Sequence, residues 1–290
     1  MNLDPRTIAA AALGRDPGPL TKARSLSNLV FLGTDVVVKL CDRHTRLSRE
    51  ATLTRHLPAG VAAPLLASGV HDNVDYACYA RMPGTSPSME AIDARTARGL
   101  AGQAIQRLEQ LHDWTPPAEV VPTLSETLDH GGFTTREAFE QEIDRVKDAV
   151  PRHVLDGLNA IAENAPARAV TTVPVHADCF WDNWLADGDA VTALLDFEWA
   201  RFGEPLDDWF FLIRFSGRHA TDVLDLVADR TALSKDVLRA GCELREANFV
   251  VSDLRIALAE EPETVAGHLV QLEELIVGRY WWSLPRSSMA

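Results

Sequence analysis

Residues 176–184 read HADCFWDNW, and this stretch decides how the rest of the chain is interpreted. It follows the apolar run TTVPV (171–175), which predicts a β-strand. Residues 183–197 predict a hairpin around the turn DGD at 187–189. The stretch is therefore expected to be a polar loop between strands.

Three polar side chains of this region are expected to lie together. Asp178 and Asn183 belong to the loop, and pairing of the hairpin strands brings Asp196 back beside them. Two carboxylates and an amide oxygen are hard ligands of the kind that Mg²⁺ prefers. Phosphoryl transfer needs such a set, because one acid orients the attacking hydroxyl while an Asn and an Asp hold metal against the phosphates. The alternative is three polar residues at solvated strand ends.

The part of the chain before this region begins with predicted strands. Strands are expected over 28–32, 35–40, 61–70 and 74–82, with a helix over 45–57 that Pro58 and Gly60 terminate. The segment MPGTSPS (82–88) has the composition of a linker.

Beyond the linker the pattern becomes helical. Helices are predicted over 91–112, 134–149, 151–164, 207–228, 233–260 and 264–282. A capping box of Thr134 and Glu137 is expected to open the second of these. The layout indicates an α+β chain with two lobes, a small β-rich lobe over 1–84 and a large helical lobe over 85–290 that holds the hairpin.

The composition limits the classes of protein to which the chain can belong. The 290 residues are 46% hydrophobic and 24% charged, as in ordinary globular proteins. No apolar stretch reaches membrane-spanning length, and the N-terminal segment, which contains Asp4 and Asp16 and has no clean hydrophobic core, does not read as a secretory signal. Four cysteines without short paired spacing indicate reduced thiols, so we expect a cytoplasmic protein, either a monomer or a dimer, with no membrane partner.

The net charge of −14 is unevenly distributed. Residues 1–84 hold ten Lys and Arg against seven Asp and Glu, whereas residues 85–290 hold 18 against 35 and so carry a balance of −17. This charge disfavours nucleic acid as a partner. It favours a cationic partner for the second part of the chain, and the alternative is a charge that serves solubility.

The sequence resembles the aminoglycoside phosphotransferase family, which has a protein-kinase-like fold. HADCFWDN resembles the catalytic-loop pattern H-G-D-x4-N of that family, and LLDFEWARFGEPLDD (194–208) resembles its hydrophobic-D-x-[DE]…G-D-P…D segment. Lys39, Glu50 and the MPG sequence at 82–84 fall in the family's order, so the resemblance covers most of the chain. It implies a bilobal kinase that uses Mg²⁺ and ATP, with GTP as the alternative nucleotide, to phosphorylate a hydroxyl group.

The resemblance also implies roles for residues of the catalytic region. Asp178 would be the catalytic base, assisted by Asn183, and Asn183 and Asp196 would be the metal ligands. His176 would brace the loop, and Asp208 would brace it from the start of the next helix, at an N-cap position.

On the nucleotide side, the resemblance implies that Lys39 contacts the phosphates with Glu50 as its ion-pair partner. No glycine-rich loop is present, and Ser27 and Asn28 stand where the family often has a Ser-Asn pair that caps the phosphates. The main-chain groups of Ala80 and Met82 would contact the adenine base.

Two residues depart from the family's pattern. Ala177 replaces a glycine, which narrows the allowed backbone angles. Glu204 stands where the family has an aspartate, a difference of one methylene group.

The acceptor is expected to bind in the helical part, where this family binds its acceptors. Trp181 is predicted to face the acceptor through stacking or a cation–π contact, with Glu198 and Asp253 as further candidates. We expect a small cationic hydroxylated acceptor, foremost an antibiotic: an aminoglycoside, or a basic peptide antibiotic of the tuberactinomycin type.

Two other functions remain open from the sequence. One is a metabolic kinase for choline, homoserine or an amino sugar, and the other is a pseudokinase that binds nucleotide without catalysis. A polycationic acceptor predicts a cleft with several carboxylates, whereas choline predicts an aromatic cage with few.

Overall fold

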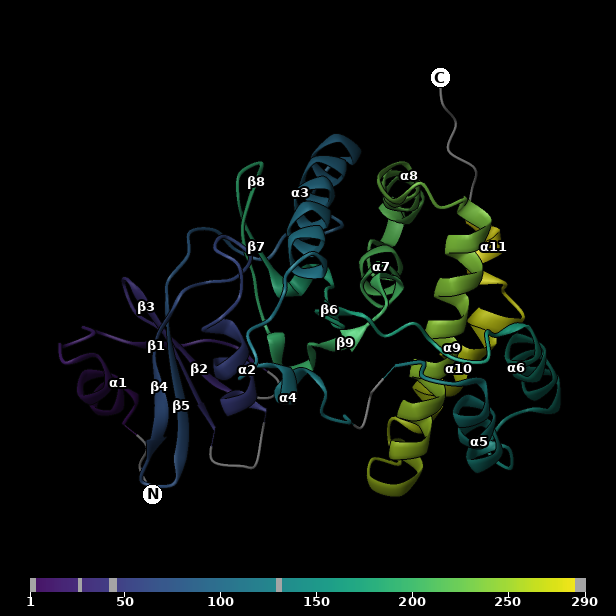
Figure 1. Cartoon of the computed structure of the whole chain (residues 1–290), viewed down its shortest axis with the longest axis horizontal. Helices are drawn as coiled ribbons and strands as arrows, with labels where there is room; N and C mark the ends of the chain where they lie inside the picture. The colour runs from purple at the N-terminus through teal and green to yellow at the C-terminus, as the bar shows by residue number, and fades with distance from the viewer. Residues whose placement is uncertain (1–3, 26–27, 42–45, 129–131, 285–290) are drawn as a thin grey trace.

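The structure is a computed structural model that describes residues 4–25, 28–41, 46–128 and 132–284. It has an α+β architecture with a strand-rich part at one end and a larger helical part at the other (Figure 1). The strand-rich part contains α1 (Pro5–Leu13), β1 (Thr21–Lys22), β2 (Leu29–Leu32), β3 (Val36–Cys41), α2 (Leu47–Thr54), β4 (Leu65–His71) and β5 (Val74–Ala80).

The first five strands form one antiparallel sheet in the order β1-β2-β3-β5-β4. The alternating burial of β3 sets its register, because Val36, Val38 and Leu40 lie in the apolar core against α1. Lys39 therefore points to the opposite face of the sheet, where α2 packs.

The helical part begins with α3 (Ala94–His112), α4 (Val121–Leu124), α5 (Arg136–Val146) and α6 (Arg152–Asn164). The middle of the chain forms β6 (Val173–Val175), β7 (Trp184–Asp187), β8 (Ala190–Leu194) and β9 (Arg201–Gly203). The last segments are α7 (Pro205–Arg214), α8 (Ala220–Thr231), α9 (Lys235–Glu260), α10 (Val265–Ile276) and α11 (Tyr280–Ser283).

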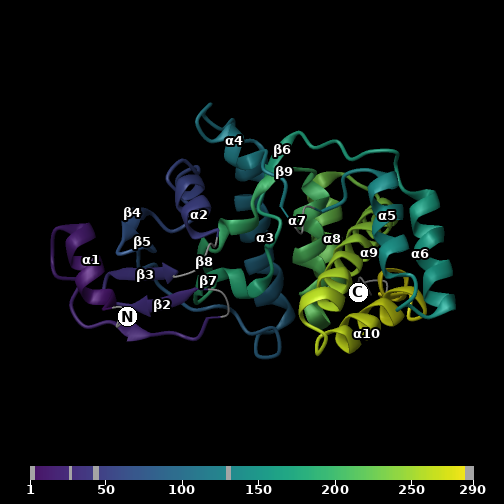
Figure 2. The same ribbon diagram turned by 90° about the horizontal axis from the view of Figure 1, so that it is seen from below.

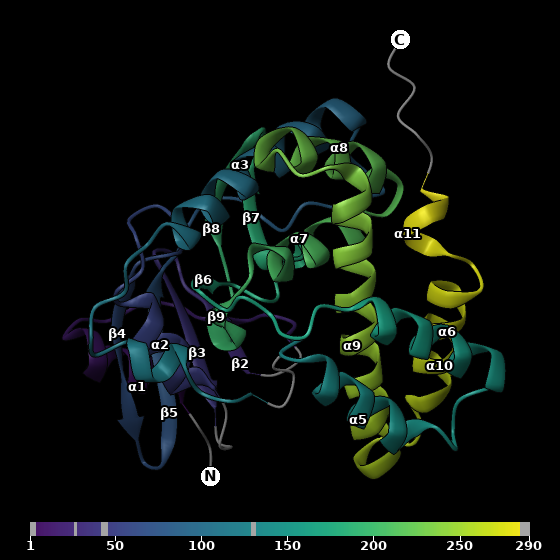
Figure 3. The ribbon, with the colours of Figure 1, turned by 45° about the vertical axis from the view of Figure 1, so that its right-hand side comes forward.

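The long helix α9 is the centre of the helical part. It packs against α5, α6, α7 and α10, and Figure 3 shows these helices gathered around it. The largest apolar core lies here and extends to the β7–β8 hairpin. In the view of Figure 2, the sheet and the helices lie at opposite ends, with β6, β7, β8 and β9 between them.

The segment after β5 connects the two parts and also pairs with the hairpin. Thr85 and Ala186 exchange backbone hydrogen bonds of 3.0 and 2.9 Å. Gly84 has a φ of +98°, and a Cβ atom there would overlap the carbonyl group of Ala186. The glycine of the predicted MPG segment is therefore required both for its backbone angle and for this close approach. The division of lobes at residue 84 stays a prediction.

Most predicted elements are confirmed, and the errors have local causes. The helix predicted over 207–228 is two helices, because the chain turns at Gly217, whose φ is +53°. The helix predicted over 264–282 is likewise interrupted, at Arg279 with a φ of 47°. The strand predicted over 61–70 begins only at Leu65. The helix α1 was missed.

The predicted capping box at Thr134 is wrong by one residue. Thr135 is the N-cap of α5, and its hydroxyl accepts a hydrogen bond from the backbone N–H of Ala138 at 3.1 Å. None of the described helices has the length and apolar character needed to cross a membrane.

Candidate active site

A buried carboxylate holds the loop that follows β6. Asp208 accepts backbone hydrogen bonds from His176 (3.1 Å) and Ala177 (2.7 Å), and it pairs with the Nε2 atom of His112 at 2.8 Å. Burial by itself would raise the pKa of Asp208, but the hydrogen bond and charge of His112 lower it below its usual value. Asp208 thus anchors the loop as an ionised group.

The predicted N-cap position of Asp208 is wrong. The N-cap of α7 is Glu204, which forms a reciprocal capping box with Asp207, and Asp208 lies one residue further along the helix. This placement turns the Asp208 carboxylate away from the helix end and toward the loop.

The side chain of His176 attaches the loop to the segment that follows β8. Its ring is fully buried against Phe197, with the ring centroids 4.4 Å apart, and its Nε2 atom lies 2.8 Å from the carbonyl oxygen of Leu195. Burial lowers the pKa of His176, so the ring is neutral, and the carbonyl requires the tautomer that carries the proton on Nε2. The hydrogen bond connects the loop to the end of the β8 segment.

Ala177 has a φ of +62°, in the left-handed region. This conformation is the one that a glycine adopts without penalty, whereas alanine pays about 1–2 kcal/mol for it. The departure from the family's glycine therefore places strain directly before Asp178.

Asp178 and Asn183 are brought together by the turn of the loop. The Nδ2 atom of Asn183 donates to the Oδ2 atom of Asp178 at 2.9 Å and to its carbonyl oxygen at 2.8 Å. This leaves the amide oxygen of Asn183 for another partner. Burial raises the pKa of Asp178 well above its usual value, and the charges of Asp196 and Glu198 raise it further.

Lys39 joins the two parts of the molecule. Its Nζ atom lies 2.9 Å from both carboxylate oxygens of Glu50 on α2, and 3.0 Å from the Oδ1 atom of Asp196 in the helical part. Burial opposes the charge of Lys39, but Glu50 and Asp196 outweigh it and raise the pKa of the amine. The Lys39–Glu50 pair was predicted, whereas the contact between Lys39 and Asp196, 157 positions apart, was not.

A cavity of about 430 Å³ lies between the sheet and the β7–β8 hairpin. The predicted residues that line it are Asn28, Lys39, Glu50, Ala80, Met82, Asn183 and Asp196. Ser27 lies outside the described residues. The N–H group of Ala80 donates to the carbonyl of Pro64 at 2.8 Å and is therefore already satisfied within the protein.

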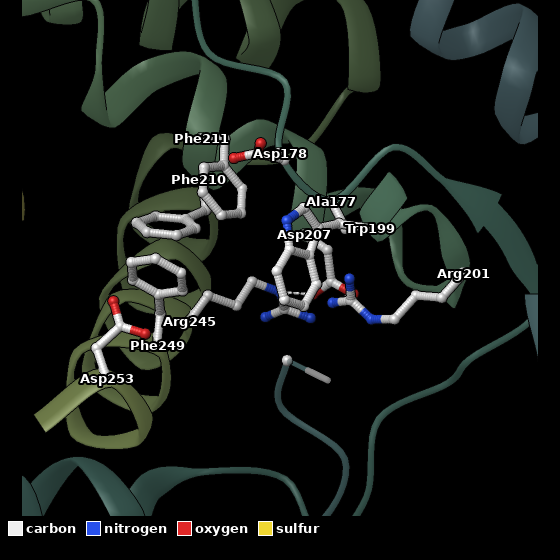
Figure 4. Close-up of a pocket in the computed structure, with 11 residues that line it drawn as sticks. Ala177, Asp178, Trp199, Arg201, Asp207, Phe210, Phe211, Arg245, Phe249 and Asp253 are labelled. Carbon is white, nitrogen blue, oxygen red and sulfur yellow. Dashed lines mark hydrogen bonds and ion pairs between the residues drawn. The ribbon is translucent and has the colours of Figure 1, made fainter. Parts of the chain in front are cut away.

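A second cavity of about 200 Å³ lies on the other side of the loop, and Asp178 lines it. Figure 4 shows its walls. Its lining residues are Gly132, Ala177, Asp178, Trp199, Arg201, Asp207, Phe210, Phe211, Arg245, Phe249 and Asp253. Asp178 thus lines the smaller cavity, whereas Asn183, its hydrogen-bond partner, and Asp196 line the larger one.

Trp181 does not face this second cavity, contrary to the prediction. Its side chain is 2% exposed, its indole N–H donates to the hydroxyl of Ser216 at 2.9 Å, and its ring stacks on Trp184 with centroids 4.3 Å apart. The tight turn at 181–183 directs the ring into the core.

The other two acceptor candidates differ from each other. Asp253 lines the cavity as expected, whereas Glu198 lines neither of the two cavities described above. Burial, followed by the charges of Asp196 and Glu50, raises the pKa of Glu198 to about 7. Arg245 and Phe249 were not predicted from the sequence, although Arg245, Phe249 and Asp253 follow one another at intervals of four residues on one helix, which was a usable signal.

The oxygen donors near Lys39 fit a hard cation. Asp196 and Asn183 each offer an oxygen at the wall of the larger cavity. Among the described residues, no group of three or more His, Cys, Asp or Glu is arranged to hold a metal ion. A small donor set of this kind suits Mg²⁺, which is commonly held by one or two side chains together with substrate phosphates and water.

The fold and this site define a kinase, that is, a phosphotransferase with an alcohol group as acceptor. The chain belongs to the phosphotransferase enzyme family, because the sequence model of that family matches residues 21–244. The protein-kinase-like fold expected from the sequence is confirmed by the similarity to solved structures. No curated protein matches the chain by sequence.

Solved structures of aminoglycoside phosphotransferases share the fold. A thermostable mutant of APH(4)-Ia, in a ternary complex with ADP and hygromycin B, is 15% identical with a TM-score of 0.67, covering 94% of this chain and 97% of that one. The gentamicin complex of APH(2")-IIa is 16% identical with a TM-score of 0.65, covering 94% and 96%. The streptomycin–ATP complex of APH(2")-IIa is 18% identical with a TM-score of 0.62, covering 95% and 99%.

Proposed function

We propose that the chain transfers the γ-phosphoryl group of ATP to a hydroxyl group of a small cationic molecule, foremost an antibiotic, and thereby gives resistance to it. The observation that carries this proposal is the contact of Lys39 with both Glu50 and Asp196 at the wall of the larger cavity, with Asp178 beyond the loop. A phosphate donor and a hydroxyl acceptor can thus approach the loop from opposite sides.

The larger cavity suits a nucleotide. A lysine that is held charged by two carboxylates provides a fixed positive group for phosphates. Two of the similar structures named above were solved with ADP or with ATP, which supports ATP as the donor, with GTP as the alternative. Asn28 would cap the phosphates, and the backbone of Ala80 and Met82 would contact the base.

Asn183 and Asp196 would hold Mg²⁺. When bound, the ion would offset the negative charge of the phosphates. Asn183 also keeps Asp178 in place, since its amide N–H groups donate to that residue.

Asp178 would accept the proton of the acceptor hydroxyl as the oxygen attacks phosphorus. Its raised pKa makes it a stronger base than an exposed aspartate. His176 and Asp208 would act only by positioning the loop. Because no side chain of the chain is required as a nucleophile, transfer would be direct.

The acceptor is proposed to be cationic because residues 85–290 carry a balance of −17, and because the similar structures were solved with hygromycin B, gentamicin or streptomycin. Asp253 would contact it. A second candidate is a metabolic kinase for an amino alcohol of the choline type. The aromatic lining of the smaller cavity favours this second candidate.

The deciding experiment replaces Asp178 by Asn and measures both ADP release with a panel of cationic antibiotics and amino alcohols and the stabilisation by Mg–ATP. We expect turnover to collapse by about a hundredfold or more, the range of general-base catalysis, while Mg–ATP still raises the melting temperature. Asp187→Asn, at an exposed position of β7, is the matched control. Nucleotide binding without turnover by the unaltered chain would indicate a pseudokinase.

A further inference from the structure

The smaller cavity is unlike a cleft built for a polycation. Four of its walls are aromatic rings: Trp199, Phe210, Phe211 and Phe249. The ring of Phe249 lies 6.0 Å from that of Phe210 and 5.5 Å from that of Phe211, measured between centroids, and it meets Phe211 edge to face. Figure 4 shows this cluster on the side of the cavity formed by α7 and α9. A flat or cyclic apolar group can bury its surface here.

The charges deep in this cavity are already balanced by one another. The Nε atom of Arg245 donates to Asp207 at 2.8 Å, and the guanidinium of Arg201 donates to the other oxygen of Asp207 at 3.1 Å (Figure 4). Arg245 also pairs with Glu204. The two guanidinium groups and the two carboxylates of this network are all largely buried, and their charges sum to zero. The network therefore adds no net negative charge that would attract a cation.

Cations also lie against the aromatic wall. The guanidinium of Arg46 stacks on Trp199, 3.8 Å from the ring centroid, and Arg201 and Arg245 line the cavity itself. Because Asp207 and Glu204 balance the charges of Arg201 and Arg245, an ammonium group of the acceptor placed beside Asp178 would find no uncompensated carboxylate in this network. Uncharged oxygen atoms would instead find guanidinium N–H donors there.

Negative charge increases away from Asp178. Arg245, Phe249 and Asp253 follow one another at intervals of four residues along one face of α9. Asp253 also lines a further cavity of about 510 Å³, together with Glu261 and Glu263. The acceptor side thus changes from balanced and aromatic near the base to acidic at its outer end.

We propose that the acceptor is charge-segregated: its reactive hydroxyl lies on an uncharged, ring-bearing end that enters the aromatic cavity, and its cationic end lies at Asp253. This inference rests on the proposed function. It sets the chain apart from a kinase for a molecule whose ammonium groups flank every hydroxyl. The acceptor class is a cationic alcohol with an aromatic or alicyclic ring between the hydroxyl and the amine.

The test compares two small alcohols by calorimetric titration of the full chain in the presence of Mg–AMP-PNP. In para-(aminomethyl)benzyl alcohol a ring separates the hydroxyl from the amine, whereas in symmetrical diaminopropanol two ammonium groups flank the hydroxyl. We expect the benzyl alcohol to bind about tenfold more tightly, the effect of one ring contact in a desolvated site. Tighter or equal binding of diaminopropanol or of gentamicin, or no binding of the benzyl alcohol, would overturn the inference.

A pair of variants on α9 locates the binding. Phe249→Ala is expected to weaken binding of the benzyl alcohol about tenfold and to leave the affinity for Mg–AMP-PNP unchanged, which also shows that the variant is folded. Leu258→Ala, at an exposed position of the same helix, is expected to change neither affinity. An unchanged affinity of Phe249→Ala for the alcohol would contradict the assignment.

The two proposals fail in different ways. If Mg–AMP-PNP does not bind, or no alcohol is phosphorylated, the proposed function is wrong, while the comparison of the two alcohols without nucleotide still decides what the cavity selects. If gentamicin is phosphorylated with higher kcat/KM than the benzyl alcohol, the proposed function holds and the charge-segregated acceptor is wrong.

Discussion

Arg49 on α2 donates to the backbone carbonyl of Ala200, 2.6 Å away in the helical part of the molecule. The same guanidinium donates to the carbonyls of Glu198 (2.9 Å) and Thr123 (2.7 Å). Its side chain is only 7% exposed. Because Arg49 precedes Glu50 on α2, these bonds tie the helix that positions Lys39 to the segment that follows Asp196.

Arg49→Ala is expected to destabilise the protein by about 3 kcal/mol, because it leaves several buried carbonyl groups without their donor. Urea unfolding measures the loss. Arg55→Ala is the matched control, since the side chain of Arg55 is exposed and donates to the hydroxyl of Ser68, and we expect it to change stability by no more than about 0.5 kcal/mol. Equal effects of the two variants would contradict the role assigned to Arg49.

Ala177→Gly is expected to stabilise the protein by about 0.5 kcal/mol. Relief of the left-handed conformation, about 1–2 kcal/mol, exceeds the entropic cost of glycine, about 0.5–1 kcal/mol. Ala193→Gly, at a buried position of β8, should instead destabilise by about 1 kcal/mol, because no strain is relieved there. Thermal denaturation of the two variants measures the difference in sign, and a loss of stability in both would show that Ala177 is not strained.

Asp208→Asn is expected to destabilise the protein by about 3 kcal/mol at neutral pH, since it removes the charge that pairs with His112 and weakens the acceptor of two backbone N–H groups. The pKa of Asp208 is lower in the folded state than its ordinary value of 3.8. Its contribution to stability is therefore complete above that value and is lost as pH falls through the lower, folded pKa.

The pH dependence gives this prediction its own control. In urea unfolding at a series of pH values, the difference between the unaltered chain and Asp208→Asn should be constant above about pH 5 and should narrow below about pH 4. A difference that does not change with pH would show that the charge of Asp208 is not what stabilises the loop.

Trp181→Phe is expected to lower the free energy of unfolding by about 1–2 kcal/mol, because the buried hydroxyl of Ser216 loses its indole donor and the core loses volume. The KM for the acceptor should remain unchanged, since the ring does not line either cavity beside the loop. Steady-state kinetics of the variant measure its KM for the acceptor, and urea unfolding of the same variant measures its stability. A rise in KM without a loss of stability would restore the contact predicted from the sequence.

The elements predicted best from the sequence are those whose structure depends on neighbouring residues. The apolar run at 35–40 predicted the strand that holds Lys39, and helical spacing over 45–57 predicted the helix that holds Glu50. The loop 176–184 was likewise predicted between strands. Errors in the elements occurred where one residue adopts a positive φ, as at Gly217 and Arg279, because such turns leave little trace in hydrophobic periodicity.

The sequence by itself indicated the kinase class of this protein, because the motifs HADCFWDN and LLDFEWARFGEPLDD, which carry the resemblance to a kinase family, are local properties of the chain. Tertiary packing alone decided that Asp196 meets Lys39, that Trp181 turns into the core, and that aromatic rings from α7 and α9 surround the cavity beside Asp178. The physical reason is that a side chain's neighbours across the fold depend on how whole helices and strands pack. Periodicity reports which face of an element is apolar, but not which distant element covers that face.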